Sequence, residues 1–425
     1  MAGAERPGMT DAVVVGGGLA GLVAARHLAE SGHSVTLLEE RPVVGGRVRT
    51  AHEDGYTFDR GFQVLFTAYP AVKRELDVEA LSPRPFTPGA TIARPNHRSV
   101  LSDPLRNPTA APQTILNRDV GFVDKLRVFA LQRELAGRDP DRILAGGGQT
   151  IESYLADRGF SRRFVERFAA PFYGGITLDR SLQTDSAIFE YTYKMLSEGE
   201  IFVPAGGMAA MPEQLADRAR SAGATIETGR AVTALDAADG TVTVETDGET
   251  LTADGAVVAT DPGSAARLTN VATIPTETLG CVTQYFALPT SKAPSMGKRI
   301  VLNATDDRPN TVAPLSTVAP EYAPDGMELY SATFLGTSAA GDDELAAEVR
   351  RALSSWYPAA GFDGLEHLRT DHVPLAQFAQ PPGFRDGLPD PNDPEGPVAL
   401  AGDYTRWSSI QGALESGRVA ANLLT

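Results

Sequence analysis

Cysteine and histidine are scarce in this sequence. The single cysteine, Cys281, excludes an intramolecular disulfide and any cysteine-rich metal cluster. Six histidines occur among 425 residues, and none belongs to an H-E-x-x-H pattern. We therefore expect no metal site, and a protein that works in a reducing compartment.

Long apolar runs are also absent. The most apolar stretch, residues 12–25, is interrupted by glycines and is shorter than the about 18 residues that indicate a membrane span. No basic segment followed by an apolar core and a small-residue cleavage site opens the sequence, as a secretory signal would require. We expect a cytoplasmic protein, and the sequence leaves peripheral contact with a membrane open.

Positive charge is in short supply. The chain has 54 acidic and 38 basic residues, five of them lysines, and a net charge of −16. This balance argues against a nucleic-acid partner, which would need a basic face. An acidic, lysine-poor composition fits a halophilic protein, because salt screens the self-repulsion. It fits equally well an acidic protein from a GC-rich genome.

The length excludes a single small module. Two domains, each with its own core, fit comfortably within 425 residues. Hydrophobic residues make up 42% and charged residues 22% of the chain, as in ordinary globular proteins.

A glycine-rich turn separates two apolar runs near the start. Residues 11–15 predict a strand, residues 16–21 read Gly-Gly-Gly-Leu-Ala-Gly, residues 22–30 predict a helix, and residues 34–38 predict a second strand. This order is typical of a dinucleotide-binding βαβ unit. The alternative is a glycine-rich turn of an α/β domain that binds nothing.

The spacing of the glycines has a physical reading. Gly16 permits the tight turn, Gly18 lets backbone amides approach a pyrophosphate, and Gly21 lets the helix pack closely on the strand. The positive end of the helix dipole then faces the phosphates. Glu39, at the end of the second strand, could accept hydrogen bonds from ribose hydroxyls. It suits NAD or FAD and disfavours NADP.

The next segment points to a flavin. Gly45, Gly46 and Arg47 place a guanidinium just past the second strand, where it could hold a diphosphate. With this segment the sequence resembles the flavin-dependent amine oxidase superfamily, which includes carotenoid (phytoene) desaturases and protoporphyrinogen oxidases. In that superfamily a G-G-R segment follows the first βαβ unit and helps to bind FAD. The resemblance therefore implies FAD as the cofactor.

Four later segments extend the resemblance. Residues 56–64 match an F-D-x-G segment that passes beside the flavin ring, and residues 204–208 match a P-x-G-G-M segment. Residues 225–232 predict a strand, and the family uses the backbone of a residue like Val232 to reach the adenine. Residues 398–421 predict a final strand and helix, which in the family bind the ribityl or diphosphate region and face the pyrimidine end of the flavin.

Carried over residue by residue, the resemblance implies a set of cofactor-binding positions in this chain. They are Gly16, Gly18, Leu19, Ala20, Gly21, Glu39, Glu40, Gly45, Gly46, Arg47, Gly61, Phe62, Gln63, Val232, Gly402, Asp403, Ile410, Gly412 and Ala413.

The matches also imply the fold. We expect an α/β protein whose Rossmann-like FAD-binding domain is discontinuous and carries an inserted α+β substrate domain. The expected FAD-binding domain comprises 9–70, 204–262 and 376–425, and the expected substrate domain comprises 71–203 and 263–375. Within the first insertion, residues 122–135 predict an amphipathic helix.

The chemistry follows from a further absence. No second G-x-G-x-x-G occurs, so a separate NAD(P)H domain is not expected. The flavin would take its electrons from the substrate and pass them to oxygen or a quinone. We expect dehydrogenation of a small, apolar organic molecule, with hydride transfer to flavin N5.

The substrate class rests on two positions. Amine oxidases of the superfamily place a lysine near flavin N5 and an aromatic cage at its face. By a loose register, Gln284 takes the place of the lysine, and Ser409 stands where a cage tyrosine is expected. Gln63 and Gln284 are the polar candidates for catalytic residues. Alternatives are an amine oxidase, a flavin-dependent isomerase with no net oxidation, and a flavoprotein that holds FAD for structure alone.

Overall fold

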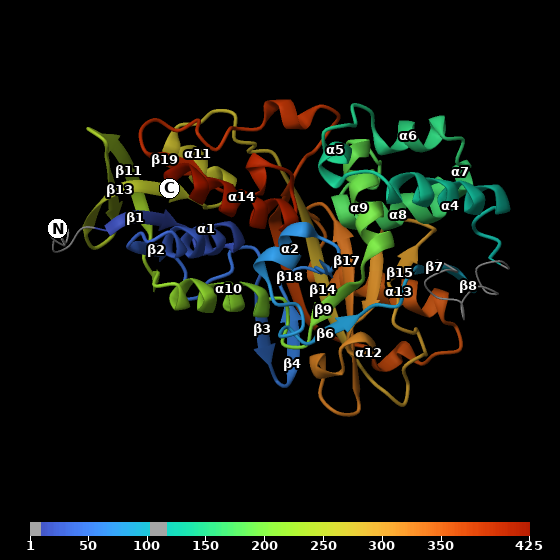
Figure 1. The fold of residues 1–425 in the computed structure, drawn as a ribbon. Coiled ribbons are helices and arrows are strands. Elements are labelled where there is room, and N and C mark those ends of the chain that lie inside the picture. The colour runs from blue at the N-terminus through green and yellow to red at the C-terminus, as the bar shows by residue number, and fades with distance from the viewer. Residues whose placement is uncertain (1–9, 103–116) are drawn as a thin grey trace.

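Two large mixed sheets, placed side by side, organise the chain (Figure 1). The structure, a computed structural model, describes residues 10–102 and 117–425. Residue 9 of the expected FAD-binding domain and residues 103–116 of the expected substrate domain lie outside the described residues. Within the described ranges, no helix is both long and apolar enough to cross a membrane.

The first sheet combines strands from the beginning, the middle and the end of the chain. β1 pairs in parallel with β2 and β13, β2 with β10, and β13 with β19, while β11, β12 and β13 form an antiparallel meander. The order is β10 (Thr225–Thr228), β2 (Val35–Glu39), β1 (Thr10–Val15), β13 (Thr250–Val258), β12 (Thr241–Thr246) and β11 (Val232–Ala238), with β19 (Val398–Leu400) on β13.

Both faces of this sheet are covered. Ala12 and Val14 face a core shared with α1 (Leu19–Glu30), α10 (Ala210–Ser221) and α14 (Ile410–Leu424). Val13 and Val15 face the opposite core, with α11 (Pro262–Thr269). A strand buried on both faces reads as a continuous apolar run, which is why residues 12–15 contain no polar side chain.

The second sheet carries the inserted segments. Its order is β18 (Glu366–Phe378), β14 (Thr278–Pro289), β17 (Met327–Leu335), β16 (Thr311–Pro314), β15 (Val301–Asn303), β7 (Ala90–Arg94) and β8 (His97–Leu101). The amphipathic helix α13 (Asp342–Trp356) covers one face, where Leu345, Val349 and Leu353 join the core.

Two small sheets and several short helices connect these layers. The sheets are β3 (Thr50–Glu53) with β4 (Tyr56–Asp59), and β5 (Leu65–Phe66), β9 (Ile201–Pro204) and β6 (Pro83–Pro85). The short helices are α2 (Pro70–Glu75) and α12 (Leu315–Val318).

A helical layer follows β8 in the chain. It contains α4 (Phe122–Ala136), α5 (Pro140–Leu144), α6 (Ile151–Asp157), α7 (Arg162–Phe164), the π-helix η2 (Val165–Ala169), α8 (Ala170–Thr177) and α9 (Ser186–Glu198). Four phenylalanines stack along the path from α7 to α8, with successive ring centroids 4.7, 5.5 and 5.3 Å apart. Phe160 and Phe164 are buried, while Phe168 and Phe172 are half-buried.

The strand expected over residues 225–232 is wrong as a single element. It is divided into β10 and β11, because Gly229 takes a φ of +71°, in the left-handed region that ends an extended strand. The two segments reach opposite edges of the first sheet.

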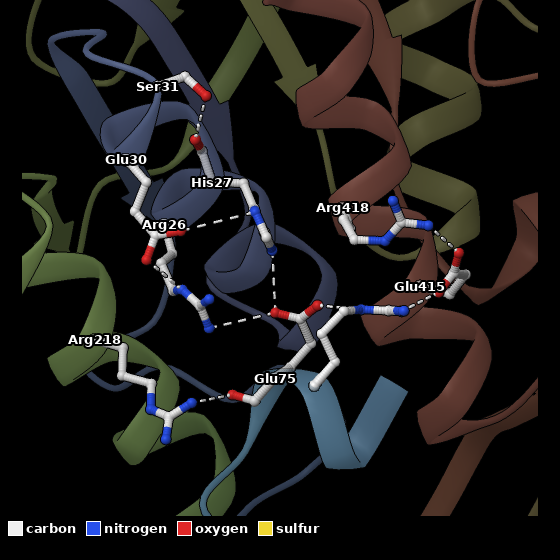
Figure 2. A network of polar contacts seen from close by, with 9 residues as sticks. Arg26, His27, Glu30, Ser31, Glu75, Arg218, Glu415 and Arg418 are labelled. Atoms are coloured by element: carbon white, nitrogen blue, oxygen red, sulfur yellow. Dashed lines mark hydrogen bonds and ion pairs between the residues drawn. The ribbon is translucent and has the colours of Figure 1, made fainter. Parts of the chain in front are cut away.

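Glu75 joins four helices (Figure 2). Its side chain is fully buried and accepts hydrogen bonds from Arg26 (3.3 Å) and Arg74 (2.9 Å), with His27 Nε2 at 3.1 Å. Arg218 of α10 donates to the Glu75 carbonyl oxygen at 2.8 Å, and Arg74 also pairs with Glu415 of α14. Burial raises the pKa of the Glu75 carboxyl, but the bonds and charges of these partners outweigh it and hold the pKa below its usual range.

Substituting Glu75 tests the weight of this network. A lowered pKa in the fold means that the ionised carboxylate stabilises the protein above about pH 4.5, and that this contribution is lost as the pH falls through the folded-state value. We expect Glu75→Gln to lower the free energy of unfolding by about 1.5–3 kcal/mol at pH 7. The difference from the unchanged protein should shrink below about pH 4. Urea titrations at several pH values measure both.

Glu30→Gln is the matched control. Glu30 pairs with Arg26 in the same network, but its side chain is 47% exposed. We expect a change of less than about 0.5 kcal/mol. Equal losses in the two variants, or a Glu75 effect that does not vary with pH, would contradict the assignment.

Candidate functional site

In the glycine turn after β1, side chains at Gly16 and Gly21 would collide with the protein, whereas a side chain at Gly18 would enter open space. A Cβ at Gly16, where φ is +108°, would lie 2.7 Å from the carbonyl oxygen of Ala259. One at Gly21 would lie 1.9 Å from the carbonyl oxygen of Gly16. At Gly18, which precedes α1, a Cβ would meet nothing within 4 Å. The open side therefore coincides with the helix N-terminus, where an anion would be bound. The first residues of α1, Leu19 and Ala20, are buried.

Glu39 ends β2 with both carboxylate oxygens engaged. Oε2 accepts a hydrogen bond from the Gly17 amide at 2.7 Å, and Oε1 accepts one from the Arg41 amide at 3.0 Å. Each oxygen keeps a second lone pair for a ligand hydroxyl. Glu40 lies differently, because its side chain is 64% exposed and approaches Arg41 at 3.6 Å. Gly17 is not among the site residues predicted from the sequence, although its place in the middle of the Gly16–Gly18 run could have indicated it.

The loop with the two glycines lies against this turn. The Gly45 amide donates to the Gly17 carbonyl at 2.7 Å, and a Cβ at Gly46 would lie 3.3 Å from the Gly18 Cα. Arg41 also holds this loop, donating to the Gly46 carbonyl at 3.2 Å. A side chain at Gly46 would crowd the approach to Gly18, whereas one at Gly45 would collide with the Val48 carbonyl oxygen.

Arg47 reaches from this loop to the other end of the chain. It donates to Asp403 Oδ1 at 2.6 Å and to the Ala376 carbonyl at 3.1 Å. Asp403 is 2% exposed, and its Oδ2 accepts a hydrogen bond from Ser408 Oγ at 2.9 Å. Burial lowers the pKa of the Arg47 guanidinium, but the charge and hydrogen bond of Asp403 outweigh it and raise the pKa above its usual value. Arg47 therefore stays charged.

The last helix begins beside this ion pair. Gly402 precedes Asp403, and its amide donates to Ser416 Oγ at 2.9 Å. Ser409, where an aromatic cage residue would stand, is instead the N-cap of α14. Its Oγ accepts from the Gly412 amide at 2.8 Å, and its carbonyl oxygen accepts from the Ala413 amide at 3.0 Å. The amides of Gly412 and Ala413 are thus bonded within the first turn, and Ile410 precedes them.

The segment that follows β4 contains three of the predicted cofactor-binding residues, Gly61, Phe62 and Gln63. Gly61 has a φ of +78°, and a Cβ there would lie 3.7 Å from Val373 and 4.0 Å from Cys281 Sγ. The ring of Phe62 packs edge-on against Phe86. Gln63 Nε2 lies 3.5 Å from the Arg47 carbonyl oxygen, while Gln63 Oε1 is buried without a partner.

The segment before Val232 lies against the end of β2. The Arg230 amide donates to the Glu39 carbonyl and the Gly229 amide to the Arg41 carbonyl, both at 2.8 Å. Val232 then opens β11 as a half-buried residue. The backbone of 229–232 is thus brought next to Glu39.

Gln284, a catalytic candidate from the sequence, lies on the α13 side of the second sheet. It is fully buried in β14, and its Nε2 donates to the Asp342 carbonyl (2.8 Å) and to Thr370 Oγ1 (3.1 Å), on the face covered by α13. Its neighbour Tyr285 points the opposite way and donates to the Asp59 carbonyl. Because successive side chains of a strand alternate between faces, Gln284 points away from Gly61.

The thiol and the carboxylates near the site form no metal centre. Burial raises the pKa of Cys281 to about 11, so the thiol stays protonated at neutral pH. Across residues 10–102 and 117–425, no group of three or more His, Cys, Asp and Glu side chains could hold a metal ion.

A sequence profile of the flavin containing amine oxidoreductases matches residues 19–425. The chain belongs to this family. Members of this family are flavin-containing oxidoreductases; the cofactor is FAD, and the fold includes a Rossmann-like FAD-binding region. The turn that is open at Gly18, the unpartnered Gln63 Oε1 and the charged Arg47 fit such a cofactor: a helix N-terminus and a guanidinium suit its diphosphate, and a free amide oxygen can accept a hydrogen bond from it.

Individual members of the family resemble the chain in different ways. A phytoene dehydrogenase of Streptomyces griseus is 30% identical over 279 residues, which is 59% of this chain and 54% of that protein. The chain thus matches about half the length of this relative. An oxidoreductase from Methanosarcina mazei has a similar structure, with a TM-score of 0.75 and 18% identity over 97% of this chain and all of the other. Cyclohexylamine oxidase from Brevibacterium oxydans gives a TM-score of 0.70 and 19% identity over 98% of both chains. The fold alone therefore does not choose the substrate.

Glu39 and Glu40 offer a matched test of the nucleotide end. Glu39→Ala removes the acceptor for two backbone amides and, as the sequence predicts, for a ribose hydroxyl of the cofactor. We expect FAD binding to weaken by about 10- to 100-fold, as loss of a charged hydrogen-bond partner costs about 1.5–3 kcal/mol. Glu40→Ala removes an exposed carboxylate and should change the Kd for FAD less than twofold. Reconstitution of the apoprotein, followed by flavin fluorescence, measures both. Similar losses in the two variants would refute the assignment.

Proposed function

We propose that the protein dehydrogenates an apolar organic molecule in the manner of the carotenoid desaturases. The observation that carries this proposal is that β14, which by a loose register corresponds to the lysine segment of the amine oxidases, contains no lysine at any position. Its residues on the Gly61 side include Cys281 and Tyr285, both uncharged at neutral pH because burial raises their pKa. The 30% identity to a phytoene dehydrogenase supports the same class.

An aromatic cluster at the start of α14 supports an apolar substrate. Tyr69, Tyr191 and Trp407 are all buried, with ring centroids 5.2 to 6.2 Å apart. Trp407 stands two residues before the N-cap Ser409. A wall of this kind excludes water from the reacting bond and orients a flat, apolar molecule.

Different residues of the chain bind different parts of the cofactor. We assign the diphosphate to the N-terminus of α1 and to Arg47, the adenosine ribose to Glu39, the ribityl chain to Asp403 and the adenine to the backbone at Val232. The amides of Gly412 and Ala413 are used inside the helix, so we assign the pyrimidine oxygen to the start of α14 at Ile410.

The same assignment implies the domain division. The FAD-binding domain comprises 9–70, 204–262 and 376–425, and the substrate domain comprises 71–203 and 263–375. The strands of the first sheet all come from the former ranges, and those of the second come from the latter together with the first residues of 376–425.

The reaction itself removes a hydride and a proton from neighbouring carbons. FAD, when bound, supplies the hydride acceptor at N5. The positive end of α14 stabilises negative charge that develops at the pyrimidine side. The proton is released to solvent, and oxygen or a quinone takes the two electrons afterwards. The chain itself contributes binding, orientation and exclusion of water.

Anaerobic flavin reduction tests the substrate class. The purified holoenzyme is mixed with a detergent-dispersed polyene, a porphyrinogen or a primary amine, and the flavin absorbance is followed. We expect bleaching by the polyene or the porphyrinogen and none by the amine. Bleaching by the amine alone would establish an amine oxidase. Isomerised polyene from chemically reduced enzyme, without net oxidation, would establish an isomerase. No bleaching by any donor would leave a structural flavoprotein.

Gln63 and Gln284 can be separated by mutation. Gln63→Ala removes a buried amide beside Arg47, and we expect the rate of flavin reduction to fall by about tenfold, the effect of one hydrogen bond. Gln284→Ala acts on the α13 face. It should lower stability but leave the reduction rate within about twofold. Stopped-flow reduction and thermal unfolding measure the two effects. A tenfold slower reduction in Gln284→Ala with an unchanged flavin spectrum would reverse the assignment.

A further inference from the structure

The helix α4 has apolar residues on two opposite faces. Leu131 and Leu135 are buried on the inner face, and the helix packs there against α9, where Lys194 donates to the Leu135 carbonyl. The outer face carries large apolar side chains that are exposed: Phe122 is 72%, Val123 55%, Leu126 53% and Phe129 42% exposed.

This exposure is concentrated. Among the described residues, six large hydrophobic side chains are exposed, and four of them belong to the first eight residues of α4; the others are Val43 and Leu423. Phe122, Leu126 and Phe129 follow a helical spacing of four and three, so they form one stripe. Clustered large apolar side chains on a surface mark a binding site for an apolar partner.

The charges around this stripe have the opposite sign to the chain as a whole. Residues 117–136 and 162–169 carry seven basic and four acidic side chains, whereas the whole chain has a net charge of −16. Two of the four acids, Asp119 and Asp124, are buried and bonded within the protein. The other two, Glu134 and Glu166, pair with arginines.

Exposed arginines lie near α4, and one of them lies on the stripe. Ser161 donates to both carboxylate oxygens of Asp124, at 2.8 and 2.6 Å, and so fixes α7 against the first turn of α4. Arg162 and Arg163 follow, and the Arg162 side chain is 90% exposed. Arg133 lies over the ring of Phe129 at 5.7 Å, on the stripe itself. Figure 1 shows α4 and α7 together at the end of the molecule opposite β11.

We propose that the outer face of α4 binds the surface of an anionic lipid bilayer. A helix that presents aromatic and aliphatic side chains, flanked by arginines, has the composition of an interfacial helix that lies in the plane of a membrane. The excess of acidic residues elsewhere on the chain is repelled by the same surface, so the charge distribution selects this end for contact. An acidic protein partner would match the arginines but would leave the four apolar side chains uncovered.

A series of packed rings runs through the helical layer. From Phe160 the rings lead through Phe172 and Tyr173 to Phe189 of α9. The membrane contact does not depend on what the substrate is.

Vesicle flotation tests the proposal with the full-length holoenzyme. We expect it to bind vesicles of phosphatidylglycerol and phosphatidylcholine, and vesicles of phosphatidylcholine alone much more weakly. Phe122→Ser with Phe129→Ser should lower the binding by tenfold or more, because both side chains are lost from the apolar stripe. Arg162→Gln with Arg163→Gln should lower binding to the anionic vesicles only, as added salt should for the unchanged protein.

Leu423→Ser is the matched control, since Leu423 is 41% exposed at the far end of the molecule and should not affect binding. All these side chains are exposed, so the variants should keep their flavin and their melting temperature. Absence of binding by the unchanged protein, or equal binding by the Phe122 and Phe129 double variant, would overturn the proposal. Light scattering supplies another test: a dimer that the double variant converts to a monomer would identify the face as a contact between two copies and would equally overturn it.

Discussion

The ion pair between Arg47 and Asp403 holds the two ends of the chain at one place. The residues are 356 positions apart, and the 2.6 Å contact fixes the loop after β2 to the end of β19. A buried carboxylate left without its partner would be strongly destabilising, so the two segments have to fold together. The glycine turn, the loop at Gly45 and the start of α14 are all positioned relative to this pair. The close contact between Gly417 and the Ala20 carbonyl joins α14 to α1 in the same region.

A second buried carboxylate, that of Asp59, likewise joins segments that are far apart in the sequence. Asp59 accepts hydrogen bonds from Thr50 Oγ1 (2.6 Å), the Met208 amide (2.8 Å) and the Tyr322 hydroxyl (2.9 Å). Burial raises its pKa although these three bonds lower it. In the structure it ties the F-D-x-G segment to the G-G-M segment and to an inserted one, and with Tyr285 on its carbonyl oxygen it fixes β14 beside Gly61.

Features that depend on local constraints can be predicted from the sequence, whereas features that depend on contacts between distant segments cannot. The turn at Gly16–Gly21 and the acid at Glu39 were predictable because a tight turn and a close helix restrict the residue type locally. The face of the second sheet to which Gln284 points could not be predicted, because moving the register of a strand by one residue turns each side chain to the opposite face. Residues 250–258 form a single strand through Gly255, which pairs with Ala12 and keeps the backbone extended. That pairing joins segments more than 200 residues apart and has no local signal.

The helix α4 shows the same limit and links charge to function. Periodicity predicts a helix over 122–135, but a helix with apolar residues on both faces does not reveal which face has a partner. Only the structure shows that the inner face packs against α9 and that the side chains of the outer stripe are exposed. The acidic surface and the basic end then act together, because repulsion over most of the protein orients the one end that an anionic membrane attracts. At about 1 M salt the screening length falls to about 3 Å, so the electrostatic attraction between the arginines and an anionic membrane is largely screened. Apolar contact is not screened in this way, and excluded salts strengthen it. In a halophilic setting the four apolar side chains would therefore carry the attachment, whereas in dilute salt the arginines would guide the approach.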